Sequence, residues 1–246
     1  MKKAAALVLS LLMLFSASAL ADVFTIVTDK EFRPFEYTDE YGDLTGIDVD
    51  ILTAVAADQG FSYILRPVGF ADSIVACQSG EADGMMAGVS ITDDRKESGW
   101  IFSDGYFEAS QAIAVKADAD IDSFEDLEGQ QVAVKIGTSG AEYARELREQ
   151  YGFTTMFFED SPSLYVAVIG GECAACFDDA PILDNYIEKA GMPMKLVEGT
   201  ENDSKPYGLA VFSEDQQNLL DQFNKGLANI KANGKYDAII AKYITP

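Results

Sequence analysis

The stretch "MMAGVSITDDRKE", residues 85–97, contains the unit from which the fold is built. It begins as a short apolar segment typical of a buried strand, turns at Gly88, and continues into a helix that has Arg95 in its first turn. A strand followed by a loop and a helix is the repeating unit of a parallel sheet that is covered by helices. Ligands of such sheets bind at the carboxyl ends of the strands, so the polar residues of this loop are candidate binding residues.

The same unit recurs in both halves of the chain. Apolar strand-like runs alternate with amphipathic helical patterns over residues 23–98. After a single strand-like run at residues 111–116, a second alternating series covers residues 131–198. The tail has one strand-like run, residues 207–212, and two helical stretches, residues 215–232 and 235–243. Because the tail cannot form a sheet of its own, we expect it to join one of the two series. The order predicts an α/β protein with two units.

The first 21 residues have the pattern of a secretory signal peptide. Two lysines precede an apolar run of about a dozen residues and an A-x-A cleavage site that ends at Ala21. The alternative is a membrane anchor, but the run is too short to span a bilayer. No cysteine lies near the cleavage point, so we expect a soluble extracytoplasmic chain that starts at Asp22 and carries no lipid anchor.

Charge and cysteine content exclude several classes of function. The formal net charge of −23 disfavours nucleic acid as a partner, because phosphate binding requires a basic patch. Cys173 and Cys176 form a C-x-x-C spacing, which is found in redox and zinc sites. The run "CAACF" is strand-like, so the two thiols are expected on opposite faces, and the chain has no histidine for zinc. We predict that both cysteines, and Cys77, are buried structural residues, and we predict no metal and no cofactor.

Four loops that follow predicted strands carry polar residues and aromatic walls. Opposite charges from two units would converge on one water-filled crevice, as a zwitterion requires: a guanidinium for a carboxylate and an acid for an ammonium. The residues are Asp29, Ser90, Arg95, Lys135, Thr138, Asp178 and Asp179, with Phe32 and Phe70 as apolar walls.

Each of these residues also has a structural explanation. Arg95 could pair with Asp93, Asp94 or Glu97 beside it on the helix. Asp178 and Asp179 could cap the helix that follows them, and the two phenylalanines could simply be core residues. The pattern alone leaves these alternatives open.

Several longer motifs bear a resemblance to a known family. They are "TDKEFRPFEY" (28–37), "LTGIDVDI" (44–51), "GVSITDDRKESGWIFSDGYF" (88–107), "FEDLEGQQVAVKIGTSG" (124–140), "FDDAP" (177–181) and "NGKYDAIIAKY" (233–243). Together they resemble the polar amino-acid solute-binding proteins of ABC importers, bacterial extracellular solute-binding protein family 3, and most closely the periplasmic glutamine-binding proteins. The resemblance implies the type II periplasmic binding protein fold, in which two lobes on a two-strand hinge close over a ligand in the cleft between them. It implies lobe 1 at residues 22–104 and 208–246, a hinge at 105–109 and 203–207, and lobe 2 at 110–202.

The resemblance also assigns roles to the candidate residues. Arg95 would bind the ligand α-carboxylate, assisted by Ser90, the Gly88 backbone and the Thr138 region, and Asp179 would bind the α-ammonium. Phe32 and Phe70 would enclose the side-chain stem, and Asp29 would bind its far end. Lys135 matches glutamine binders, whereas Asp178 and Ser139 depart from their pattern, in which histidine and glycine are usual. The backbone at Ala87 completes the predicted ligand-binding set.

The predicted function is therefore capture of a polar L-amino acid, with glutamine favoured, for a membrane-embedded ABC permease. The chain is expected to be a monomer and to have no catalytic residue. Alternatives are a basic amino-acid binder of the same class, an enzyme on the same scaffold similar to cyclohexadienyl dehydratase, and a sensor subunit. With no histidine, an enzyme would have to use an acid, a lysine or a tyrosine for proton transfer.

Overall fold

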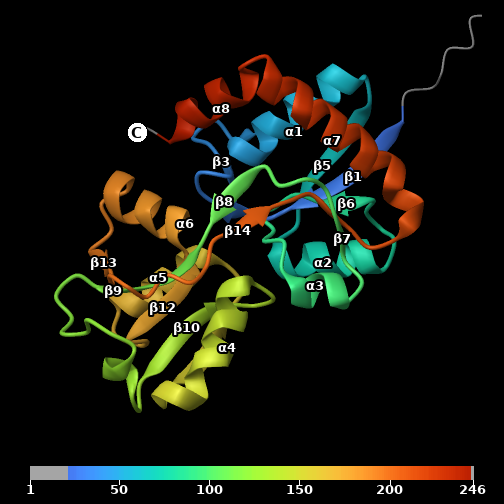
Figure 1. Cartoon of the computed structure of the whole chain (residues 1–246). Coiled ribbons are helices and arrows are strands. Elements are labelled where there is room, and N and C mark those ends of the chain that lie inside the picture. Colours follow the sequence, from blue (N-terminus) through green and yellow to red (C-terminus); the bar gives the residue numbers. More distant parts are fainter. Residues whose placement is uncertain (1–21, 245–246) are drawn as a thin grey trace, which may run out of the picture.

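The computed structural model describes residues 22–244 and has two sheet-bearing lobes (Figure 1). The predicted signal peptide, residues 1–21, lies outside the described residues. The first sheet has the strand order β5-β1-β6-β15-β7, and the second has the order β11-β10-β12-β9-β13. In the first sheet the strands are β1 (Val23–Thr28), β5 (Ser62–Pro67), β6 (Gly84–Met85), β7 (Ile101–Phe102) and β15 (Ala210–Val211). In the second they are β9 (Gln111–Lys116), β10 (Gln131–Lys135), β11 (Thr154–Phe158), β12 (Ala175–Asp179) and β13 (Met194–Leu196).

The two sheets share one topology. Three strands of each main sheet run parallel, with the earliest of the three in the middle: β1 lies between β5 and β6, and β10 lies between β11 and β12. Antiparallel strands complete each sheet: β15 and β7 in the first, β9 and β13 in the second. The parallel strands of both series therefore end at corresponding edges, which is where polar loops were expected to meet.

Helices connect and cover these strands. Helix α1 (Ile47–Gln59) ends at Gly60, whose φ of 78° is the left-handed conformation that favours glycine. Helices α7 (Gln217–Ala232) and α8 (Lys235–Tyr243) of the tail pack on α1 (Figure 1). The other helices are α2 (Phe70–Gln78), α3 (Asp93–Glu97), α4 (Ser139–Tyr151), α5 (Ser161–Ile169) and α6 (Ala180–Asp184), with a π-helical turn at Asn185–Lys189 and 3-10 turns at Glu125–Leu127 and Glu214–Gln216.

Two small sheets lie outside the main ones. Strands β8 (Phe107–Ala109) and β14 (Lys205–Tyr207) pair antiparallel and run between the lobes (Figure 1). They fall within the two segments predicted as the hinge, and the exact lobe boundaries stay a prediction. Strands β2 (Glu31–Phe32), β3 (Glu36–Thr38) and β4 (Leu44–Thr45) form a second small sheet that the sequence analysis did not anticipate.

One predicted strand is displaced along the chain. The apolar run suggested a strand at residues 173–177, whereas β12 covers Ala175–Asp179. Cys173 precedes the strand and is nevertheless 2 % exposed, so its apolar character reflects burial in a turn and not strand structure. As a result Asp178 and Asp179 lie within the strand and not in the loop after it. All three cysteines are buried with free thiols, which confirms the predicted burial.

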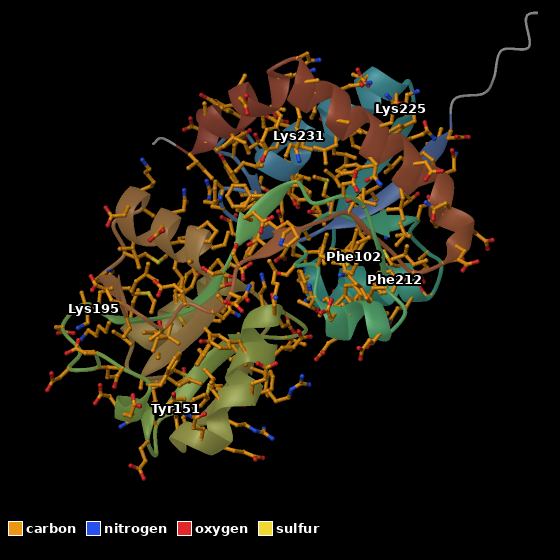
Figure 2. The ribbon with its side chains drawn as sticks, viewed as in Figure 1. Phe102, Tyr151, Lys195, Phe212, Lys225 and Lys231 are labelled. Carbon is orange, nitrogen blue, oxygen red and sulfur yellow. The ribbon has the colours of Figure 1, made fainter. Side chains whose placement is uncertain are left out.

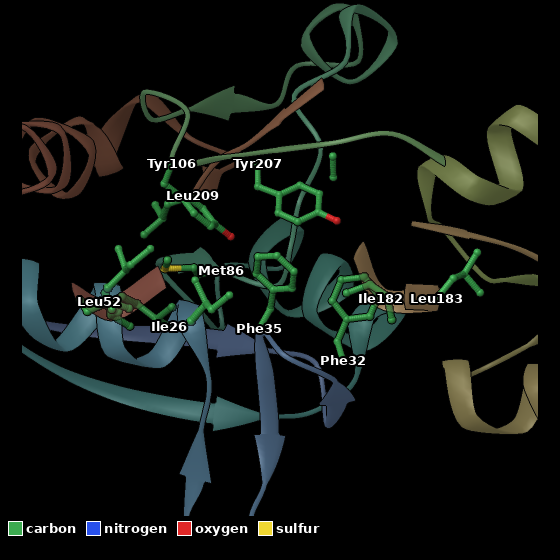
Figure 3. Packing of buried hydrophobic residues seen from close by; sticks show 14 of the residues in the cluster. Ile26, Phe32, Phe35, Leu52, Met86, Tyr106, Ile182, Leu183, Tyr207 and Leu209 are labelled. Carbon is green, nitrogen blue, oxygen red and sulfur yellow. The ribbon is translucent and has the colours of Figure 1, made fainter. Parts of the chain in front are cut away.

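The hydrophobic core joins the two lobes. One cluster of buried residues includes Ile26 in β1 and Leu164 in α5, and thus runs from one lobe into the other (Figure 3 shows part of it). A separate cluster in lobe 1 is flanked by Trp100, which packs against Phe102 and Phe212; these two lie close together in Figure 2. Among residues 22–244, none of the helices combines the length and the apolar composition needed to cross a bilayer.

Candidate functional site

The predicted binding residues meet where the two lobes touch. One network of contacts includes Asp29, Phe32, Phe70, Gly88, Ser90, Arg95, Lys135, Thr138 and Ser139. Asp178 and Asp179 contact each other and lie close enough to Lys135 for their charges to interact, and Ala87 is buried in the lobe 1 core beside the site. The site lies at the ends of β1, β6, β10 and β12, with α3 and the starts of α2 and α4 around it. Its members are Asp29, Phe32, Phe70, Ala87, Gly88, Ser90 and Arg95 from the first series and Lys135, Thr138, Ser139, Asp178 and Asp179 from the second.

Lys135 and Asp29 form a buried ion pair between the lobes. Lys135 Nζ lies 2.8 Å from Asp29 Oδ2, and both side chains are 1 % exposed. Burial opposes the charge on Lys135, but the nearby carboxylates of Asp29 and Asp178 outweigh it and raise the pKa of Lys135. Lys135 therefore remains an ammonium, 106 residues away from its partner in the sequence.

The aromatic walls enclose this ammonium. Lys135 Nζ lies 4.2 Å from the centre of the Phe32 ring and 5.5 Å from that of Phe70. Both rings are 4 % exposed, so they are core residues as well as walls of the site. In Figure 3 Phe32 lies between the lobe 1 residue Phe35 and the lobe 2 residues Ile182 and Leu183. A cation held against aromatic faces is stabilised by their quadrupoles.

Arg95 is held by carbonyl groups and not by the acids next to it. Its guanidinium donates to Ser90 O at 2.8 Å and, across the lobes, to Gly137 O at 3.1 Å. Within residues 22–244 no carboxylate oxygen lies within 4.0 Å of this guanidinium, and Asp93 pairs with Lys96 instead. The expectation that Arg95 faces a water-filled crevice was wrong: it is 4 % exposed, because the lobes are packed against each other.

Local structure explains how Arg95 is aimed at the site. Thr92 is the N-cap of α3 and accepts a hydrogen bond from Arg95 N at 3.3 Å. This bond fixes the first turn of a helix of only five residues. The guanidinium then extends over aromatic rings, with its central carbon 5.0 Å from the centre of Trp100 and 5.8 Å from that of Phe70.

The two adjacent aspartates of β12 have separate partners. Asp179 accepts from Gln111 Nε2 at 2.7 Å and from the Tyr207 hydroxyl, while Asp178 accepts from the Tyr165 hydroxyl at 2.7 Å and from the Asp179 amide. Asp179 stands at the N-cap position of α6, but its side chain makes no cap hydrogen bond. Burial, then Asp178, raises the pKa of Asp179 to about 6, although its two donors and Lys135 oppose the shift.

The hydroxyl groups of the site also form hydrogen bonds within the protein. Ser90 Oγ and Ser139 Oγ are 2.9 Å apart across the lobes. Thr138 caps α4 through Ala141 N and donates to Lys135 O, so its hydroxyl serves the local fold.

The amide of Gly88 donates to Asp48 Oδ2 at 2.9 Å. The expectation that the Gly88 backbone assists a carboxylate is therefore wrong for its N–H, and only its carbonyl is available to a ligand. A carbonyl suits an ammonium.

Two cavities flank the site. One of about 270 Å³ is lined by Asp29, Phe70, Gly69, Ile136 and Asp160, among others. Another of about 220 Å³ lies on the side of Gln111 and Ser139. Residues of both lobes line each cavity, so the width of each cavity depends on how closely the lobes approach one another.

Three residues that hold the site acids were not predicted from the sequence. Gln111 and Tyr207 bind Asp179, and Tyr165 binds Asp178. Gln111 and Tyr207 lie next to or within the predicted hinge segments, and that position was the available signal. Tyr165 sits in an apolar helical pattern and gave no sign of a polar role, because its ring packs in the core and only its hydroxyl reaches the site.

The chain is similar in sequence and in fold to known amino-acid-binding proteins. The chain is similar to a probable histidine-binding protein of Neisseria gonorrhoeae, with 31 % identity over 90 % of this chain and 82 % of that protein. Among solved structures, it is similar to the arginine-, lysine-, histidine-binding protein ArtJ of Geobacillus stearothermophilus, with 30 % identity, a TM-score of 0.83 and coverage of 92 % of this chain and 96 % of that chain. It is also similar to an ancestral arginine-binding protein bound to glutamine, with 33 % identity, a TM-score of 0.84 and coverage of 92 % and 100 %.

These similarities confirm the predicted two-lobe α/β fold. Residues 24–246, nearly the whole described chain, match one family. The chain belongs to the bacterial extracellular solute-binding proteins, family 3.

Proposed function

We propose that this protein captures a polar L-amino acid outside the cytoplasm, with glutamine first, and presents it to a membrane-embedded ABC permease. The observation that carries the proposal is the buried Arg95. Its guanidinium has only carbonyl partners among residues 22–244, so its charge is left for an anion. A ligand α-carboxylate is the anion that a planar guanidinium binds best, by two parallel hydrogen bonds.

The other end of an amino acid would bind lobe 2. Asp179 lies across the cleft from Arg95, close enough for the two charges to interact. An α-ammonium on Asp179 and an α-carboxylate on Arg95 would tie the lobes together. Ligand binding then stabilises the closed form by the difference in its affinity for the two forms. The site requires no chemical step, and we propose that the protein is not an enzyme.

The ion pair of Lys135 with Asp29 favours glutamine as the ligand. An ammonium donor and a carboxylate acceptor side by side are complementary to a carboxamide, whose oxygen accepts and whose NH₂ donates. The cationic side chain of a basic ligand would lie next to Asp29, whose charge Lys135 already neutralises. It would also be repelled by Lys135, by about 1 to 4 kcal/mol at 4 Å depending on the dielectric.

A basic amino acid is the second candidate, and one observation favours it. The site buries three acids, Asp29, Asp178 and Asp179, against two bases, Arg95 and Lys135. A zwitterion leaves this excess of negative charge, whereas a cationic ligand would neutralise it. Relatives named for arginine, lysine and histidine support the same reading.

Arg95→Ala tests the binding role. We expect calorimetry with glutamine to show loss of measurable binding, since breaking one side of a buried charged pair costs about 3 to 5 kcal/mol. Arg145→Ala, which removes an exposed arginine, is the matched control and should bind as wild type. Binding by the Arg95 variant within threefold of wild type would refute the carboxylate role.

A thermal-shift panel of the twenty amino acids tests the ligand. At about 1,000-fold excess over Kd, the true ligand should stabilise the protein by roughly 4 kcal/mol. Glutamine should lead, and a largest shift from arginine or lysine would reject it.

Lys135→Met separates the two ligand hypotheses further. It should weaken glutamine binding while freeing Asp29 and so improve arginine binding. Loss of affinity for both amino acids would mean that Lys135 holds the lobes closed and does not select the ligand.

A further inference from the structure

Beneath the lobe 1 half of the site lie two buried acids that the proposed ligand does not use. Glu36, in β3, is fully buried, and Asp48, in the first turn of α1, is 2 % exposed. Their backbones are neighbours, because Asp48 N donates to Phe35 O at 2.9 Å. The contact is tight: a Cβ on Gly46, whose φ is 132°, would lie 2.0 Å from Phe35 O. The start of α1 therefore holds the backbone of Asp48 against the backbone next to Glu36.

Hydrogen bonding in this pair is one-sided. Asp48 Oδ2 accepts from Gly88 N at 2.9 Å and from the Tyr106 hydroxyl at 2.8 Å. Asp48 Oδ1 and both oxygens of Glu36 have no partner among the described residues. A buried carboxylate without a single donor is far more costly than a buried carboxylic acid. Glu36 is therefore expected to carry a proton, and that proton needs an acceptor.

We propose that Glu36 and Asp48 share one proton, carried by Glu36 and donated to Asp48 Oδ1, and that this pair positions Gly88 and Tyr106. The arrangement gives Asp48 a third donor. It leaves Glu36 with only a carbonyl-type oxygen unpaired, which is less costly than a bare charge. Gly88 belongs to the binding site, and Tyr106 immediately precedes the hinge strand β8.

The surrounding charges agree with this location of the proton. Burial, then Asp48, Asp29 and Glu31, raise the pKa of Glu36 well above 4.5, and only Lys135 opposes them. Burial raises the pKa of Asp48 to about 7, but its bonds from Gly88 and Tyr106 lower it. Of the two acids, we assign the negative charge to Asp48, because the hydrogen bonds from Gly88 and Tyr106 stabilise its ionised form. The groups that face the pair come from α1, β2, the loop after β1 and the end of β10.

The pair connects the binding site to the hinge. Tyr106 N donates to Tyr207 O at 2.8 Å, and the Tyr207 hydroxyl binds Asp179 in lobe 2. Figure 3 shows Tyr106 and Tyr207 above Phe35, with the Tyr207 hydroxyl directed toward lobe 2. Asp48 therefore holds one end of a chain of contacts that reaches the proposed ammonium site. The affinity readout below rests on the proposed function, and the readouts without ligand do not.

Glu36→Gln and Glu36→Leu separate a shared proton from mere packing. The glutamine NH₂ can donate to Asp48 as the acid does, so this variant should bind glutamine within threefold of wild type. Leucine leaves Asp48 Oδ1 unpaired, and binding should weaken by roughly tenfold or more. Glu40→Gln, at an exposed position, is the matched control. Equal behaviour of the two Glu36 variants would overturn the proposal.

Two measurements without ligand keep the test independent of the function. Infrared spectra at pH 7.5 should contain a protonated carboxyl band that Glu36→Gln removes and Glu40→Gln retains. Its absence from wild type would overturn the proposal in favour of a buried water or ion. If no amino acid binds at all, the proposed function fails while these spectra still decide on the proton.

Urea unfolding at several pH values measures the direction in which the stability of the protein changes with pH. Because the folded protein holds a proton on Glu36 that the unfolded chain releases, wild type loses stability as the pH rises above about 4.5 toward the folded pKa. Glu36→Gln has no proton to release at this position, so it does not lose stability in this way. The urea midpoint of the variant minus that of wild type should therefore increase as the pH rises. A constant difference between the two proteins would overturn the proposal.

Discussion

Two buried pairs of acids, one in each lobe, are surrounded by the protein in opposite ways. Asp178 and Asp179 in lobe 2 are 3 % and 5 % exposed, and four donors reach them. Glu36 and Asp48 in lobe 1 are 0 % and 2 % exposed, and the two donors that reach them from the described part of the chain bind a single oxygen, Asp48 Oδ2. Burial is therefore nearly equal, while the supply of hydrogen bonds differs.

This difference indicates which acids can serve as charges. A carboxylate in the interior stays ionised when donors and a cation compensate for its lost water. Asp179 has donors from Gln111 and Tyr207 and is also stabilised by Lys135, so it can become the partner of an ammonium. Glu36 receives no hydrogen bond from residues 22–244, and it is suited to hold a proton. Asp179 and Glu36 are both buried acids, and the difference in their hydrogen-bond donors gives them different roles.

Asp179→Asn should give the largest contrast with Glu36→Gln. Loss of the charge that meets the ligand ammonium should weaken glutamine binding by about 3 to 5 kcal/mol, more than a hundredfold in Kd. Calorimetry on both variants, with Asp178→Asn beside them, measures the difference. An intact ammonium pocket in the Asp179 variant would move this role to Asp178.

The affinity should also fall in acid. Asp179 has a pKa of about 6, so it is ionised above that pH and neutral below it. Because an ammonium binds the ionised form, Kd should rise roughly tenfold for each pH unit below 6. A fluorescence titration of glutamine binding between pH 5 and 8 measures this slope. A flat profile would show that Asp179 remains charged throughout, and the Asp179→Asn variant should lack the slope.

Tyr165→Phe would make the lobe 2 pair more like the lobe 1 pair. It removes the hydroxyl that donates to Asp178 Oδ2 at 2.7 Å and leaves a buried acceptor unpaired. We expect a loss of about 1 to 3 kcal/mol in the free energy of unfolding. Urea denaturation measures it, with Tyr41→Phe as a control because Tyr41 is 82 % exposed. A loss no greater than that of the control would mean that Asp178 finds another donor.

The smallest effect on binding is expected from the cysteines near the lobe 2 pair. Cys173→Ser and Cys176→Ser together should leave glutamine affinity unchanged, since neither thiol belongs to the site. A hydroxyl in place of a buried thiol should lower stability by about 1 to 3 kcal/mol. A thiol count on denatured, non-reduced protein should find three free thiols. A single free thiol would mean that a disulfide forms between two of the cysteines.

Local sequence patterns determined much of the fold. One amphipathic pattern of the first alternating series became α1, which ends at Gly60, and the two tail stretches became α7 and α8. The polar loops after the strands also held most of the site. These features are predictable because periodicity, caps and glycines act within one element or between adjacent ones. The strand at Cys173 was misplaced because burial in a turn has the same apolar pattern as a strand.

Only the tertiary structure decided how these groups are paired. Lys135 contacts Asp29 across 106 positions, Tyr207 reaches Asp179, and Glu36 is buried near Asp48 without a hydrogen-bond donor among the described residues. In the sequence these acids look alike, as polar residues of loops and helix starts. Their partners come from the packing of one lobe on the other and of α1 on β3, which no local pattern encodes. Since the charge of a buried acid depends on those partners, its role follows from the fold and not from the residue type.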